Sequence, residues 1–97
     1  MKQYRQGDVY LKEVVSFPED ANKLDHTTVA LGEATGHHHT FTKNATLMEK
    51  DDVVWVVAHE QSPLEHQEHD TILVPPGIYE VAIQREYSPE EIRRVQD

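Results

Sequence analysis

The longest apolar run of the chain, Val53 to Ala58, spans only six residues. Every position in it is apolar, so an extended segment here would bury both of its faces, as a central strand of a sheet does. A membrane-spanning helix needs about 20 apolar residues, and nothing in the sequence resembles a signal peptide. We therefore expect a cytoplasmic protein without membrane contact, built around a central strand at 53–58.

Turn-forming residues divide the rest of the chain into short segments. We predict a loop at 17–22, turns at Lys43-Asn44, Asp51-Asp52 and Pro75-Pro76-Gly77, and a break at Ser62-Pro63. The segment 64–70 is ambiguous between extended and helical structure. Between these points the predicted strands are 7–15, 27–34, 37–42, 45–50, 53–58, 71–74 and 78–87.

The clearest local signal is Ser88-Pro89-Glu90-Glu91. Ser88 suits a helix N-cap, Pro89 the first helical position, and Glu91 completes a capping box. A short helix from there to about residue 95 follows. We therefore predict one domain over 1–97, all-β, a mainly antiparallel small barrel or sandwich of about seven short strands with one short C-terminal helix.

Charge and composition exclude several classes of protein. Asp and Glu number 18 against 9 Lys and Arg, a net charge of −9. General DNA or RNA binding requires a basic surface, so we do not expect it; a small anionic ligand in a local pocket remains compatible. The chain has no cysteine, so it has no disulfide and no thiolate zinc site. The modest hydrophobic fraction of 37% suggests self-association, and we expect a homodimer.

Histidine is the strongest chemical bias, with seven in 97 residues. Three are consecutive, but the alternation of a strand would place His37 and His39 on one face and His38 on the other. His66 and His69 form a second pair, which shares a face only if the segment 64–70 is turned. The candidate site is therefore two pairs that a turn must bring together.

The main interpretation is a metal-free phosphodiesterase or nuclease that acts on an RNA-like or cyclic oligonucleotide. His37, His39, His66 and His69 would share general acid and base roles, because the pKa of histidine lies near neutrality. Lys43 and Arg85 would hold the phosphate. Tyr79 and Tyr87 would stack on bases or sugars. The partner would be a small anionic nucleotide, and no cofactor is needed.

Two alternatives stay open. The same four histidines could bind zinc or another divalent metal, with Glu68 or Asp70 replacing one ligand or orienting a ring. Gly36-His37-His38-His39 in a β-rich chain is similar to the Gly-x-His-x-His motif of cupins, although the glutamate that usually follows the second histidine is absent. A non-enzymatic interaction protein with an acidic surface is the other alternative.

Several short motifs also resemble those of a largely uncharacterised family of small bacterial and phage proteins. They are Gly7-Asp8-Val9 (GDV), residues 33–39 (EATGHxH), 66–69 (HxEH), 75–81 (PPGxYxV) and 84–89 (QREYxP). The resemblance draws attention to the four histidines, Arg85 and Tyr87. It also suggests a ring-nuclease-like protein of antiviral defence that degrades cyclic oligoadenylate.

Overall fold

The computed structural model describes residues 2–31 and 37–83. In these ranges the chain forms ten strands in two antiparallel sheets, which confirms the predicted all-β class. The predicted helix, Arg85 and Tyr87 lie outside the described residues. The strands are β1 (Gln3–Gln6), β2 (Val9–Val14), β3 (Asn22–Lys23), β4 (Thr28–Leu31), β5 (His38–Phe41), β6 (Ala45–Lys50), β7 (Val53–Ala58), β8 (Ser62–Glu65), β9 (Ile72–Val74) and β10 (Gly77–Ile83).

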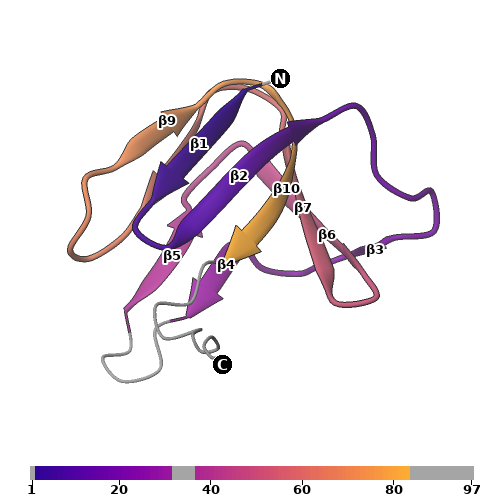
Figure 1. The fold of residues 1–97 in the computed structure, drawn as a ribbon, viewed down its shortest axis with the longest axis horizontal. Helices are drawn as coiled ribbons and strands as arrows, with labels where there is room; N and C mark the ends of the chain where they lie inside the picture. The colour runs from indigo at the N-terminus through magenta and orange to yellow at the C-terminus, as the bar shows by residue number, and fades with distance from the viewer. Residues whose placement is uncertain (1, 32–36, 84–97) are drawn as a thin grey trace, which may run out of the picture.

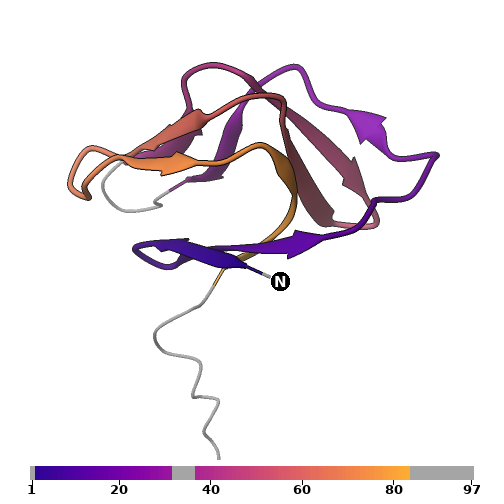
Figure 2. The ribbon, with the colours of Figure 1, turned by 90° about the horizontal axis from the view of Figure 1, so that it is seen from above.

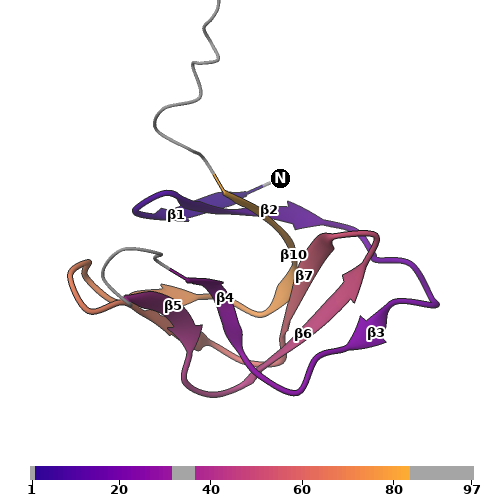
Figure 3. The ribbon, with the colours of Figure 1, turned by 90° about the horizontal axis from the view of Figure 1, so that it is seen from below.

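The larger sheet has the strand order β1-β2-β10-β7-β6-β3, and the smaller has β4-β5-β8-β9 (Figure 1). The described strands therefore form two sheets and not one closed barrel. In Figures 2 and 3, β1 and β2 form one layer, while β10 curves from it toward the layer that contains the smaller sheet. The core lies between these layers.

The predicted central strand is confirmed. β7 pairs with β10 on one side and with β6 on the other. Val56 is fully buried and Trp55 is 8% exposed. The buried apolar cluster comprises Val9, Leu11, Phe41, Leu47, Val56, Ala58, Leu64, Val74 and Tyr79.

The predicted turn at Asp51-Asp52 is confirmed as a hairpin, whereas the hairpin predicted at Lys43-Asn44 is wrong, because the chain bends there from β5 in the smaller sheet to β6 in the larger one. Both segments contain residues with positive φ. Asp51 and Asp52 have φ of 53° and 66° and join β6 to β7, while Asn44 has φ of 66° after β5. Asn and Asp tolerate this left-handed conformation better than other non-glycine residues. Two successive positive φ values match the right-handed twist of paired strands, so the register of β6 against β7 is fixed locally.

The prediction of a chain break at Ser62-Pro63 is wrong, because β8 covers both residues. Pro63 opposes Leu73 of β9, and its carbonyl accepts a hydrogen bond from the Thr42 amide. The described pairing of β8 with β5 starts one residue later, at Leu64. A proline near the start of a strand therefore removes no donor that this ladder uses.

Besides β8, two short strands were not predicted. β1 pairs with β2 across the turn at Gly7, and β3 contributes two residues beside β6, overlapping the predicted loop at Asn22. Within the described residues no helix is long and apolar enough to cross a bilayer.

Candidate functional site

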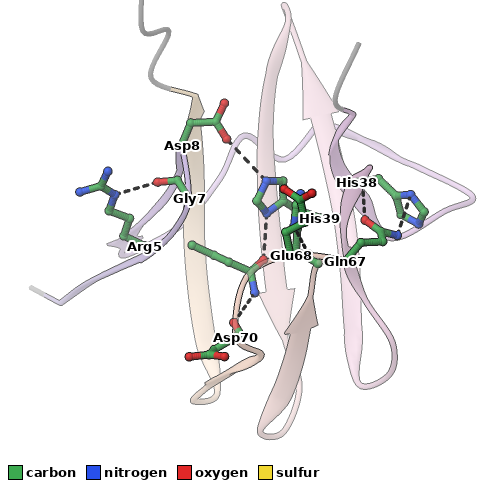
Figure 4. Close-up of polar contacts among 10 residues, drawn as sticks. Arg5, Gly7, Asp8, His38, His39, Gln67, Glu68 and Asp70 are labelled. Carbon is green, nitrogen blue, oxygen red and sulfur yellow. Dashed lines mark hydrogen bonds and ion pairs between the residues drawn. The ribbon is translucent and has the colours of Figure 1, made fainter. Parts of the chain in front are cut away.

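β5 places His39 in the interior. His39 is 5% exposed and Phe41 is 1% exposed, whereas the intervening Thr40 is only partly buried. This is the alternation predicted for an extended histidine stretch. The backbone amide of His38 donates a hydrogen bond to Gln67 Oε1 at 2.9 Å, so His38 contacts Gln67 (Figure 4).

The loop between β8 and β9 brings the second histidine pair to the first. Leu64 pairs with Ile72, and the chain between them bends at residues 67–69. The rings of His66 and His69 consequently lie 4.6 Å apart between centroids. The segment 64–70, ambiguous from sequence, is thus the end of a strand followed by a hairpin loop.

All four predicted histidines meet in one cluster, which we call the histidine cluster (His37, His39, His66 and His69). The centroid of the His66 ring lies 4.3 Å from that of His39 and 5.5 Å from that of His37. His69 stacks on His39 with centroids 6.0 Å apart and planes 18° apart. Residues separated by about thirty positions in the sequence therefore share one site.

The β1–β2 hairpin adds two residues that the sequence did not single out as ligands, Gln6 and Asp8. Gln6, 3% exposed, lies with its Oε1 2.8 Å from His39 Nδ1. Asp8 Oδ1 lies 3.5 Å from His39 Nε2, and Figure 4 shows the Asp8 carboxylate aimed at the His39 ring. Glu68 Oε2 is 3.6 Å from His37 Nδ1.

Two of the rings favour the neutral form. Burial, and then the neighbouring His66, lower the pKa of His39 below its ordinary value, although Asp8 acts in the opposite direction. Desolvation, and then His69 and His37, lower the pKa of His66. A neutral imidazole has one nitrogen with a free lone pair, which can accept a proton or bind a metal.

Not every predicted site residue joins the cluster. Lys43 is exposed and lies in the bend beyond the end of β5, and the structure describes no contact between it and the histidine cluster. Tyr79 is 2% exposed, packs edge-on against Tyr4, and donates its hydroxyl to the Pro75 carbonyl. The ion-pair partners that the structure describes for the rings of the histidine cluster are carboxylates, Glu68 beside His37 and Asp8 beside His39.

As the side chains stand, the described residues include no three His, Asp or Glu side chains whose ligand atoms converge to hold one metal ion. The rings instead pack against one another. His69 is exposed and His66 is partly exposed, so both have room to change rotamer. The cluster therefore contains side chains of the types that bind metals, but their ligand atoms do not point at a common position.

A family model described as a domain of unknown function (DUF8820) matches residues 5–84. The chain belongs to this family. The DUF8820 match includes Gln6, Asp8 and the whole histidine cluster, which fits the expected membership of an uncharacterised family. No curated protein and no solved structure matched the chain.

Gln6 and Asp8 are the site residues that sequence reasoning missed as partners of the histidines. Asp8 belongs to the GDV motif, which was interpreted only as the start of a predicted strand and as part of a resemblance. Gln6 gave no signal, because a glutamine in a short polar segment is typical of an exposed strand. Only the folded structure shows that its side chain is buried, in contact with Leu64, Asp70 and His39.

Proposed function

We propose that this protein binds a divalent transition-metal ion of the zinc type through the histidine cluster. The observation that carries the proposal is the gathering of four imidazole rings beside two carboxylates. Imidazole and carboxylate groups are the usual nitrogen and oxygen ligands of zinc. Carboxylates favour a cation in the same place and disfavour an anionic phosphate.

The spacing of the rings supports this proposal. Two imidazoles bound to one zinc at 2.0–2.1 Å in tetrahedral geometry would have ring centroids about 5 Å apart. The separations in the cluster range from 4.3 to 6.0 Å and bracket this value. Rotation of exposed side chains in the β8–β9 loop is therefore the adjustment that binding requires, without movement of the sheets.

The chemistry that such a metal supplies is polarisation of a bound water or substrate oxygen. The protein would provide a buried ligand from β5 and more exposed ligands from the β8–β9 loop, so one side of the metal would face solvent. An open position is typical of catalytic sites, whereas structural sites are closed by four protein ligands. We therefore favour a small metalloenzyme over a purely structural metal site.

Calorimetric titration of untagged protein with zinc tests the proposal. We expect one zinc per chain, and we expect the His66→Ala, His69→Ala double variant to lose at least about tenfold in affinity. The matched control is His26→Ala, His59→Ala, which removes two histidines outside the cluster and should bind zinc like the wild type. Equal binding by both double variants, or none by the wild type, would contradict the proposal.

A second candidate is the metal-free phosphodiesterase. The observation that favours it is the lowered pKa of His39 and His66, which leaves neutral rings able to act as general bases near neutral pH. The substrate would be an RNA-like or cyclic oligonucleotide such as cyclic oligoadenylate, with Arg85 as the proposed phosphate ligand. A neutral ring of the cluster would then accept the proton of the attacking hydroxyl group.

Incubation with linear and cyclic oligoadenylates in EDTA separates the two candidates. The metal-free mechanism requires cleavage that persists in EDTA and is lost in the His37→Ala, His39→Ala double variant. Cleavage that appears only with added metal would support the first candidate. Absence of cleavage from folded wild-type protein in EDTA would rule out the metal-free mechanism for these substrates.

A further inference from the structure

Gln6 is a buried side chain whose amide has a partner on each side. Its Nε2 lies 2.8 Å from the Leu64 carbonyl oxygen and 2.9 Å from the Asp70 carbonyl oxygen. Its Oε1 lies 2.8 Å from His39 Nδ1. The side chain thus connects β1 to β5 and to both ends of the loop that carries His66 and His69.

These contacts fix the orientation of the Gln6 amide. A backbone carbonyl only accepts hydrogen bonds, so the two carbonyls require the NH2 group of Gln6 to face them. The Gln6 oxygen then faces His39 and can only accept. His39 must therefore donate from Nδ1, which makes its neutral form the Nδ1–H tautomer.

The other neutral tautomer is disfavoured by the same contacts. A lone pair on His39 Nδ1 would face the Gln6 oxygen at 2.8 Å. Rotating the Gln6 amide to relieve this repulsion would remove its two hydrogen bonds to Leu64 and Asp70. Buried acceptors that lose their donors destabilise the fold.

This tautomer leaves two acceptors facing each other. In neutral His39, Nε2 carries a lone pair, and it lies 3.5 Å from the Asp8 carboxylate oxygen. Contact between this nitrogen and a carboxylate is favourable when Nε2 carries a proton, or, in the Nδ1–H tautomer, when a metal cation lies between the two atoms. Two ligand atoms bound to one zinc ion are themselves about 3.0–3.5 Å apart, so the observed separation suits a shared metal.

We propose that Gln6 is the positioning residue that holds His39 as the Nδ1–H tautomer, and that His39 Nε2 and Asp8 Oδ1 are two ligands of the metal ion. This inference rests on the proposed metal function and names part of its ligand set. His66 or His69 supplies the third protein ligand from the loop that Gln6 holds in place, which leaves the fourth position of a tetrahedral zinc ion open. The role of Gln6 corresponds to the hydrogen-bond acceptor that usually orients a metal-binding histidine.

Nuclear magnetic resonance of the wild type in EDTA tests the role of Gln6 without any metal. Long-range proton–nitrogen correlations show which nitrogen of an imidazole carries the proton, at a pH above the ordinary histidine value of 6.5. We expect a protonated Nδ1 and an unprotonated Nε2 for His39. A protonated Nε2, alone or with Nδ1, would overturn the assignment.

A variant pair extends this test to metal binding. Gln6→Met keeps the length of the side chain but removes its hydrogen bonds, and we expect zinc affinity to fall about 10- to 100-fold. Gln3→Met is the control, because Gln3 is exposed on the same strand. Equal zinc affinity of the two variants would overturn the positioning role. The wild-type spectrum decides the tautomer even if Gln6→Met fails to fold.

Asp8→Asn tests the carboxylate ligand. Asn retains the size and turn preference of Asp, but its amide is a weaker metal ligand, so we expect zinc affinity to fall at least about tenfold. Asp51→Asn, in the β6–β7 turn, removes the same charge elsewhere and should leave the affinity unchanged. Zinc binding that Asp8→Asn does not weaken would overturn the ligand role while the metal function stands. Absence of zinc binding in the wild type would rule out both the ligand role of Asp8 and the metal function. The resonance measurement of the His39 tautomer would still decide whether Gln6 orients that ring.

Discussion

Gly7 lies where the β1–β2 turn packs against the ring of His69. Its φ is +58°, a conformation that residues with a Cβ atom rarely adopt. A Cβ atom placed there would lie 2.6 Å from His69 Nε2. The glycine therefore serves two purposes, because it permits the turn and it leaves space for a ring of the histidine cluster.

Two substitutions of Gly7 separate these purposes. Gly7→Ala should lower the free energy of unfolding by about 1–2 kcal/mol, the cost of a left-handed conformation for a residue with a side chain. Gly7→Asn should be more stable than Gly7→Ala because asparagine tolerates this conformation. Both should displace His69 and weaken zinc binding. Urea unfolding and zinc titration measure the two effects, and wild-type zinc affinity in Gly7→Asn would contradict the steric role.

Single residues also show which parts of the candidate site could be predicted from the sequence. The pairing of His37 with His39 followed from strand alternation, and the structure places both in the same cluster. Gln6 could not be found in this way, since its importance depends on contacts 33 and 58 residues away along the chain. Local periodicity carries no information about such distant partners.

At the scale of elements, strands bounded by turn residues were predictable. β6 and β7 agree with their predicted ranges because positive-φ turns on Asn44, Asp51 and Asp52 fix their ends. β8 was not predicted, because the rule that proline interrupts strands ignores where neighbouring strands begin to pair. The β8–β9 hairpin is the element on which the site depends, since its loop carries two of the four rings.

At the scale of the whole molecule, the protein contains a buried apolar core and, beside it, the histidine cluster, whose rings can gain protons. Folding lowers the pKa of His39 and His66 below the ordinary 6.5. The unfolded chain therefore binds more protons than the folded protein just below that value. This contribution to stability is fully present above pH 6.5 and is lost as the pH falls toward the folded-state pKa values. The homodimer inferred from composition stays a prediction.

The consequence for the metal-free protein is a loss of stability in mild acid. Urea unfolding in EDTA should give a lower free energy of unfolding about one pH unit below 6.5 than above it. His66→Asn removes one of the two groups while keeping an acceptor for the Glu68 amide, so its pH dependence should be shallower. An identical slope for His66→Asn and the wild type would show that His66 does not contribute.

The central claim is that the histidine cluster binds metal, and zinc-edge X-ray absorption of the untagged, zinc-loaded protein tests it most directly. We expect a first shell of nitrogen and oxygen at about 2.0–2.1 Å, with the outer-shell scattering of several imidazole rings. The His66→Ala, His69→Ala variant should lose part of that imidazole signal, and His26→Ala, His59→Ala should retain it. A shell of oxygen alone, without imidazole scattering, would contradict the claim.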